Sequence, residues 1–252
     1  MSLCPAPGNI LSGPPDLLSP LNVSLLLDFD GTLVELVDRP DAVVADPALV
    51  ALLQQLAGTF AARIALVSGR SVDQLLGFFG RSLPTFAFVG SHGAEFEIGA
   101  QRVAPARPSA LGQVERAMQL AFGNMEGVIV EPKSLGVALH FRLAPEAEEH
   151  IRQFATQMAE TTGLMIQEGK MMVELRSAGH DKGSGIMNLM SHSPFCGTRP
   201  IFIGDDITDE AGFVAANRLG GFGVLVGNER PTAARFRLEN VAAVRAWLGK
   251  AA

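Results

Sequence analysis

The chain of 252 residues is poor in cysteine and has no surplus of positive charge. Its two cysteines give neither the paired framework that stabilises small secreted domains nor the ligand spacing of a zinc site. Lysine and arginine number 20 against 26 acidic residues, a formal net charge of −6. This balance argues against binding along a nucleic-acid backbone, so we expect no nucleic-acid partner. Any phosphate group that the protein handles should be bound locally.

The sequence also lacks a long uninterrupted apolar run. Charged residues, proline or glycine break each candidate before it reaches the length of a membrane-spanning helix, so we expect no membrane partner. Residues 1–22 contain no basic region that leads into a long apolar segment, unlike a secretory signal peptide. We expect a flexible N-terminal tail over residues 1–22 and a cytoplasmic protein, with a monomer favoured.

What is present is an alternation of short apolar runs with helix-length segments. Runs that are apolar on both faces are typical of a parallel sheet covered by helices on each side. Residues 46–60 begin with Asp46 and Pro47 as helix-start signals and carry apolar residues at helical spacing. The pattern predicts an α/β fold with a mostly parallel sheet, whose strands lie at residues 24–28, 64–67, 86–89, 201–203 and 223–226.

The middle of the chain follows a different pattern. Two segments with helical spacing alternate with two segments of period-two alternation, in the order helix, two strands, helix, two strands. This order predicts a compact α+β domain over residues 104–178 and not a continuation of the parallel sheet. We expect residues 23–103 and 179–252 to form one core domain.

Four of the predicted core strands end in polar clusters, at residues 28–32, 68–70, 90–95 and 204–210. Loops after the carboxyl ends of neighbouring parallel strands lie along one edge of a sheet, which is where such folds bind their ligands. That edge would gather four carboxylates, those of Asp28, Asp30, Asp205 and Asp206. Their charges repel unless a hard cation lies between them, and oxygen ligands alone indicate Mg²⁺. Lys182 and Ser68 would suit the oxygens of a phosphoryl group.

The spacing of the first two aspartates allows them different roles. In an extended strand Asp28 and Asp30 point the same way, while Phe29 points to the packed side. Because the strand must open into a turn at Gly31, one carboxylate can act as a nucleophile and the other as an acid and base. The same residues also suit a strand that runs into a polar turn without any chemistry, because Asp and Gly favour turns.

The motifs DFDGTL, VSGR, DKG and GDDITDE, in this order, resemble those of the haloacid dehalogenase superfamily of aspartyl-phosphate phosphotransferases. Within that superfamily, LVSGR, GSHGAE, KSLGVALHFR, MVELRSAGHDKG and GDDITDEAGF resemble the trehalose-phosphatase family. The resemblance implies a Rossmann-like three-layer core and a smaller α+β cap domain of the C2 type. It also implies a Mg²⁺-dependent hydrolysis of trehalose 6-phosphate to trehalose and phosphate through a phospho-aspartate.

The resemblance assigns roles to the residues of the core motifs. Asp28 would attack phosphorus, while Asp30 would protonate the departing sugar oxygen and later deprotonate the hydrolytic water. Mg²⁺ would be held by Asp28, the backbone carbonyl of Asp30, and Asp205, with Asp206 either as a further carboxylate ligand or as a carboxylate behind the ligands. The phosphoryl group would be bound by Ser68 and Lys182. These roles agree with the needs of phosphoryl transfer, which are mainly positioning and charge neutralisation.

The resemblance also implies residues that bind the sugar. Four lie in the inserted domain, Lys133, His140, Arg142 and Glu174, and three lie in the core, Arg70, His92 and Glu95. Alternation places His140 and Arg142 on the face opposite the apolar residues of the same strand. Such polar residues would equally suit the solvated face of a cap sheet.

Three features depart from the family pattern. Ser177 stands where proline is usual, His180 and Asp181 precede Lys182, and Phe141 stands where tyrosine is usual. These departures concern the substrate more than the chemistry. They leave open a phosphatase of another sugar phosphate or of a glycosyl-phosphoglycerate. The rival from another class is a catalytically silent module that binds a sugar phosphate.

Overall fold

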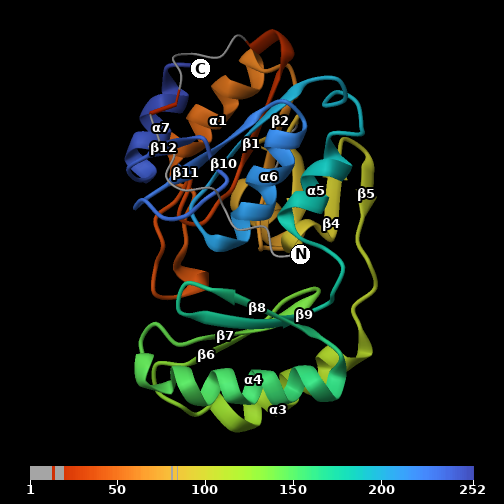
Figure 1. Ribbon diagram of the computed structural model, residues 1–252, viewed down its shortest axis with the longest axis vertical. Coiled ribbons are helices and arrows are strands. Elements are labelled where there is room, and N and C mark those ends of the chain that lie inside the picture. Colours follow the sequence, from red (N-terminus) through yellow and green to blue (C-terminus); the bar gives the residue numbers. More distant parts are fainter. Residues whose placement is uncertain (1–12, 15–19, 81, 84) are drawn as a thin grey trace. The chain divides into compact units, whose positions relative to one another are not determined.

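The computed structural model describes residues 13–14, 20–80, 82–83 and 85–252. Most of the predicted tail, residues 1–22, lies outside these stretches. The described residues form two compact units (Figure 1). The first comprises the chain up to Leu36 together with Val43–Val103 and Asp181–Ala252, and the second comprises Val37–Ala42 and Ala104–His180.

The first unit contains a sheet of eight strands in the order β12-β11-β10-β1-β2-β3-β4-β5. The strands from β12 to β3 pair in parallel, whereas β4 and β5 extend the sheet antiparallel. Their bounds are β1 Val23–Leu27, β2 Ile64–Val67, β3 Ala87–Gly90, β4 Glu95–Ile98, β5 Gln101–Val103, β10 Arg199–Gly204, β11 Phe222–Val226 and β12 Phe236–Leu238.

Strand β1 lies inside this sheet, between β10 and β2. Leu25 is in register with Ile201 on one side and with Ile64 on the other. Every residue of β1 is buried, as expected of a parallel strand covered on both faces. Leu25 and Leu27 belong to one hydrophobic core and Leu26 to a second, because successive side chains of a strand point to opposite faces.

Helices cover both faces of the sheet. The core that contains Leu25 includes side chains of α1, α2 and α7, and the core that contains Leu26 includes side chains of α5 and α6. This arrangement of three layers confirms the predicted fold class (Figure 1). The helix bounds are α1 Pro47–Thr59, α2 Val72–Phe79, α5 Lys182–Leu189, α6 Glu210–Arg218 and α7 Val241–Gly249.

The second unit contains a four-stranded antiparallel sheet in the order β6-β7-β9-β8. Helices α3 and α4 pack on one face of this sheet, where alternate residues of β7 and β9 form a separate core with them. The chain order of these elements is the predicted one of helix, two strands, helix, two strands. Their bounds are α3 Ser109–Phe122, β6 Ile129–Pro132, β7 Gly136–His140, α4 Glu148–Thr162, β8 Met165–Gly169 and β9 Met172–Arg176.

Short 3-10 turns complete the described elements: η1 Pro20–Asn22, η2 Pro40–Ala42, η3 Ser91–Gly93, η4 Pro145–Ala147 and η5 Ile207–Asp209. Among the helices of the described stretches, none has the length and apolarity needed to cross a bilayer.

Candidate active site

The carboxyl end of β1 places Asp28 inside the protein. The amide of Asp28 donates to the carbonyl of Ile203 at 2.9 Å, which continues the pairing of β1 with β10 beyond the strand. The side chain of Asp28 is almost wholly buried. Gly31 follows with a φ of +80°, and a Cβ at this position would lie 2.3 Å from Oδ2 of Asp205. Glycine is therefore required here, both for the turn and for the approach of the second acidic loop.

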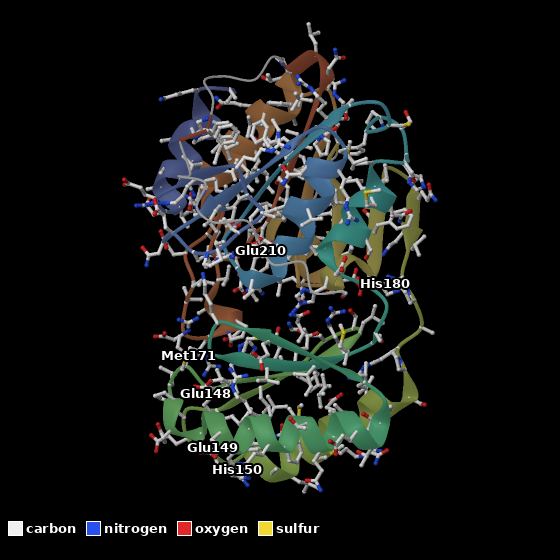
Figure 2. All side chains as sticks on the ribbon, in the orientation of Figure 1. Glu148, Glu149, His150, Met171, His180 and Glu210 are labelled. Carbon is white, nitrogen blue, oxygen red and sulfur yellow. The ribbon has the colours of Figure 1, made fainter. Side chains whose placement is uncertain are left out.

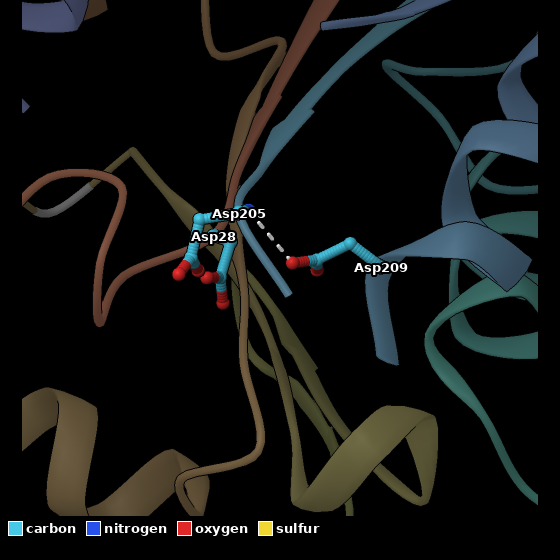
Figure 3. Close-up of side chains that lie close together, drawn as sticks. All are labelled: Asp28, Asp205 and Asp209. Carbon is cyan, nitrogen blue, oxygen red and sulfur yellow. Dashed lines mark hydrogen bonds between the residues drawn. The ribbon is translucent and has the colours of Figure 1, made fainter. Parts of the chain in front are cut away.

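The loop after β10 supplies two more buried carboxylates, those of Asp205 and Asp209. Oδ2 of Asp209 accepts hydrogen bonds from the amides of Asp205 and Asp206, both at 2.9 Å. Figure 3 shows the bond to Asp205 and the three aspartates side by side. Asp209 thus fixes the backbone that carries Asp205.

One carboxylate oxygen from each of Asp28, Asp205 and Asp209 lies within 4.8 Å of the other two. We call these three residues the carboxylate cluster. Such a set of close oxygen donors fits a hard divalent cation, because carboxylates are the ligands that Mg²⁺ prefers. The chemistry of the donors therefore agrees with the metal expected from the sequence.

Lys182, the first residue of α5, adds a positive charge to the cluster. Its Nζ donates to Oδ1 of Asp28 at 2.8 Å and to Oδ1 of Asp209 at 2.6 Å. Helix α5 begins at this point because Asp181 caps it, accepting from the amide of Ser184 at 2.6 Å. Three carboxylates and one ammonium group leave a surplus of negative charge at the site.

The pKa values of the buried pair follow from this arrangement. Burial raises the pKa of Asp28 well above its usual range, and the carboxylates of Asp209 and Asp205 raise it further, against the opposing effect of Lys182. Burial alone would lower the pKa of Lys182, but the carboxylates of Asp209 and Asp28 outweigh it, so the net pKa is raised. Lys182 therefore stays protonated and serves as a fixed positive charge.

Asp30 and Arg70, for which the sequence implied separate roles, form an ion pair with each other. Nε of Arg70 donates to Oδ2 of Asp30 at 2.6 Å, and Nη2 donates to Oδ1 at 2.8 Å. The guanidinium carbon lies 5.0 Å from the ring centre of Phe78 and 5.9 Å from that of Phe29. The two-point contact and the aromatic rings hold both side chains in defined positions.

Ser68 follows β2 and is buried. Its Oγ accepts from the amide of Arg70 at 3.1 Å, and its carbonyl accepts from the amide of His92 at 3.1 Å. His92 itself has a φ of +54°. A Cβ at Gly69 would lie 2.6 Å from Nε2 of this histidine, so Gly69 makes room for the ring. The second motif and the His92 loop are thereby packed against each other.

Two other predicted site residues have structural partners. Glu95 is buried and accepts from the amide of Val72 at 3.0 Å and from Oγ of Ser91 at 2.8 Å, so it holds the start of α2. Asp206 is not a member of the carboxylate cluster. Its Oδ1 accepts from the amide of Ile207 at 2.7 Å, as the cap of η5. The assignment of Asp206 as a metal carboxylate stays a prediction, and the three close carboxylates are those of Asp28, Asp205 and Asp209.

Three of the four predicted sugar-binding residues of the second unit, Lys133, His140 and Glu174, form side-chain hydrogen bonds. Nζ of Lys133 lies 2.6 Å from Oε2 of Glu174, and Nε2 of His140 lies 2.7 Å from Oε2 of Glu131. These side chains belong to the face of the sheet opposite α3 and α4. Arg142 is more exposed and donates to the carbonyl of Lys170 at 3.4 Å.

Sequence reasoning missed Glu131 and Arg176 on that face. Arg176 is buried and donates to the carbonyl of His180 at 2.8 Å and to Oε1 of Gln167 at 2.9 Å. Alternation could have found it, because Arg176 lies two residues after Glu174 on the same strand. Glu131 could not be paired with His140 without the register of β6 and β7.

The fold is shared with a solved phosphatase of the haloalkanoate (HAD) enzyme superfamily from Bacteroides thetaiotaomicron, which superposes with a TM-score of 0.61 at 17% identity and covers 91% of this chain and 94% of its own. A solved structure described as a trehalose-6-phosphate phosphatase related protein superposes with a TM-score of 0.73 at 29% identity, covering 89% of this chain and 95% of its own.

The comparison of sequences narrows the class to a family. A family model described as trehalose-phosphatase matches residues 26–242. A probable trehalose-phosphate phosphatase of Sinorhizobium fredii is 38% identical over 213 residues, which are 83% of this chain and 80% of that protein. A trehalose-6-phosphate phosphatase of Escherichia coli is 36% identical over 225 residues, 88% of this chain and 83% of that protein. The chain belongs to the trehalose-phosphatase family.

Proposed function

We propose that the protein hydrolyses trehalose 6-phosphate to trehalose and inorganic phosphate, with Mg²⁺ as its cofactor and a phospho-aspartate on Asp28 as the intermediate. The observation that carries this proposal is the buried Asp28, bound by Lys182 and faced by Asp205 and Asp209. The names of the two relatives above support the substrate. A silent module would not need to maintain this arrangement of buried charges, which is costly without a function.

The reaction proceeds in two displacements. An Oδ of Asp28 attacks phosphorus, the bond from phosphorus to the sugar oxygen breaks, and Asp30 donates its proton to that oxygen. A water molecule then attacks the phosphorus of the phospho-aspartate, Asp30 takes a proton from the water, and the carboxylate of Asp28 is released. Arg70 binds both oxygens of Asp30 and thereby fixes the place of its carboxyl group, and one of the two contacts would be released while Asp30 carries the proton.

The residues that would hold Mg²⁺ are Asp28, Asp205 and the backbone carbonyl of Asp30. Asp209 would orient the loop through the amides of Asp205 and Asp206, and would orient Lys182 through its Nζ. When bound, the cation would supply the charge neutralisation that a transferring phosphoryl group requires. Ser68 and Lys182 would bind the oxygens of that group.

We further propose that residues 23–103 and 179–252 act as the catalytic core and residues 104–178 as the cap that recognises the sugar. Lys133, His140, Arg142 and Glu174 would bind sugar hydroxyls from the polar face of the cap sheet, and His92 would do so from the core. For Glu95 we propose a structural role, because its carboxylate accepts from the amide of Val72 at the start of α2 and from Oγ of Ser91 in η3.

Phe141, which stands where tyrosine is usual, is compatible with the proposed substrate. Its side chain is fully buried in the core that α3 and α4 share with the sheet. A tyrosine hydroxyl at this position would therefore not extend the polar face that carries Glu174 and His140.

The substrate is tested by phosphate release from trehalose 6-phosphate, glucose 6-phosphate, sucrose 6-phosphate and glucosyl-3-phosphoglycerate. We expect kcat/KM for trehalose 6-phosphate to exceed the others by at least about tenfold, a difference of about 1.4 kcal/mol in transition-state binding. An equal or higher kcat/KM for another of these compounds would contradict trehalose 6-phosphate as the preferred substrate. An absence of release from all four would favour the silent module.

A further inference from the structure

A segment that the proposed reaction does not use reaches the loop of Asp205 from outside the carboxylate cluster. Arg230, which follows β11, donates from Nη2 to the carbonyl of Asp206 at 2.8 Å. Its Nη1 donates to the carboxylate of Glu210, the first residue of α6 (Figure 2). The other carboxylate oxygen of Glu210 accepts from the amide of Ala233 at 2.8 Å.

These bonds complete the restraint of the turn that follows Asp205. The amides of Asp205 and Asp206 are held from inside the protein by Asp209. The carbonyl of Asp206 is bound by Arg230. The amide and the carbonyl of residue 206 are thus both bound, which restrains the backbone that presents the carboxylate of Asp205.

The two contacts of residue 230 require an arginine. One planar guanidinium reaches a carboxylate with one nitrogen and a backbone carbonyl with the other. A lysine carries a single compact ammonium group on a flexible stem, so it would satisfy one acceptor well and the second poorly.

We infer that Arg230 is a positioning residue for the divalent cation, which it serves by holding the turn that presents Asp205. This inference rests on the proposed function, which places the cation at Asp28 and Asp205. Mutation of a residue that orients metal ligands without touching the metal commonly weakens metal binding by about 10- to 100-fold.

If Arg230 acted only through its charge, its replacement would change the Mg²⁺ affinity in the opposite direction. Arg230 carries a positive charge, so its loss should help a cation to bind if the residue acts only through its charge. Loss of the positioning contact should weaken binding instead. The sign of the change therefore separates the two effects.

The experiment measures Mg²⁺ binding by titration calorimetry on the full chain, without substrate, for the wild type, Arg230→Gln and Arg230→Lys. Arg235→Gln is the matched control, because Arg235 is exposed on the same segment and its loss removes the same charge. We expect the Kd for Mg²⁺ to rise at least about tenfold in Arg230→Gln and less in Arg230→Lys, with Arg235→Gln near the wild type.

Each result has a defined meaning. A Kd in Arg230→Gln that equals or falls below that of the control overturns the inference. If Arg230→Gln fails to fold, the charge-conserving Arg230→Lys decides alone, and an unchanged Kd there overturns it. A wild type that binds no Mg²⁺ refutes the metal assignment of the proposed function, whereas a wild type that binds Mg²⁺ but releases no phosphate refutes the activity and leaves the role of Arg230 standing.

Discussion

Asp28 is buried at the end of β1, yet it must be ionised to attack phosphorus. Burial and the neighbouring Asp209 and Asp205 raise its pKa, and Lys182 opposes them. A divalent cation beside Asp205 would act in the same direction as Lys182, because each positive charge favours the carboxylate over the carboxylic acid. The reactivity of this one side chain thus depends on charges supplied by loops far away in the sequence.

Replacement of Asp28 by Asn should abolish turnover, since an amide oxygen cannot form the phospho-aspartate. We expect phosphate release from trehalose 6-phosphate to fall by at least about a thousandfold. The fold should persist, because the amide oxygen can still accept from Lys182. Asp41→Asn, at an exposed ion pair with Arg39, is the matched control and should keep full activity. Unchanged turnover in Asp28→Asn would place the nucleophile elsewhere.

Replacement of Lys182 by Met should destabilise the fold as well as stop the reaction. The change leaves Asp28 and Asp209 buried without their positive partner, and removing one member of a buried ion pair costs about 3–5 kcal/mol. Urea unfolding in the presence of EDTA, without bound metal, measures this loss of stability. Lys250→Met, at an exposed position, should stay within about 0.5 kcal/mol of the wild type. Equal stability of the two variants would show that the pair carries little energy.

Residue types alone could identify Asp28 and Asp205 of the carboxylate cluster, but neither Asp209 nor every contact of the cluster. Asp28 and Asp205 could be predicted because each follows an apolar strand, and Lys182 because it stands in the DKG motif. The pairing of Arg70 with Asp30 could not, because it depends on the placement of two loops and on the rings of Phe29 and Phe78. The contact of Glu95 with the start of α2 also depends on the placement of two loops, so the sequence indicated only a residue that binds the sugar.

Helix α1 shows how a local signal in the sequence becomes a stable element. Asp46 accepts from the amide of Leu49 at 2.9 Å, and Pro47 occupies the first turn, as the sequence predicted. Nη1 of Arg245, from α7, also contacts the carboxylate of Asp46 at 2.6 Å. One side chain therefore caps α1 and joins it to the last helix of the unit.

The Asp46→Ala variant should lose about 1 kcal/mol of stability, the usual effect of removing a helix cap. Asp46→Asn should lose less at neutral pH, because its oxygen can still accept from Leu49. Asp38→Ala, at an exposed position, is the control and should lose almost nothing. A loss of the same size in Asp38→Ala would show that the cap is not the cause.

The stability difference between the wild type and Asp46→Asn should depend on pH. The hydrogen bond from Arg245, and then that from Leu49, lower the pKa of Asp46 in the folded protein. A lowered folded pKa stabilises the protein above the unfolded value of about 4, and the effect disappears as the pH falls through the folded value. Urea unfolding should therefore show a gap at pH 7 that closes toward pH 3. A gap that widens in acid would contradict the ion pair.

The elements that the sequence did not predict are the short or exposed ones. Strands β4, β5 and β12 were absent from the expected sheet. All three residues of β5 are exposed, so no apolar run marks them, and β5 exists through its pairing with β4 across a turn at Gly99. By contrast β2 was placed at its observed bounds, because all four of its residues are apolar and buried.

At the scale of the whole molecule, a cation that binds only the folded chain should raise its stability. We expect Mg²⁺ to raise the Tm of the wild type and EDTA to lower both Tm and phosphate release, with about 2.7 kcal/mol gained when Mg²⁺ is at 100 times its Kd. Asp205→Asn should show little rise in Tm, because it lacks a proposed ligand. An equal rise in both proteins, or phosphate release that is indifferent to EDTA, would contradict the metal site.

The position of β1 between β2 and β10 has a consequence for biosynthesis. Asp28 and Lys182 are 154 residues apart, and the partner strand β10 is translated later still. A nascent chain that has completed the second unit therefore still carries β1 with one apolar edge lacking its partner, which is the kind of edge that recruits strands from other molecules. Translation of residues 181–204, an interval of a few seconds at about 5–20 residues per second, supplies the strand that pairs with this edge, and Asp205 follows at once.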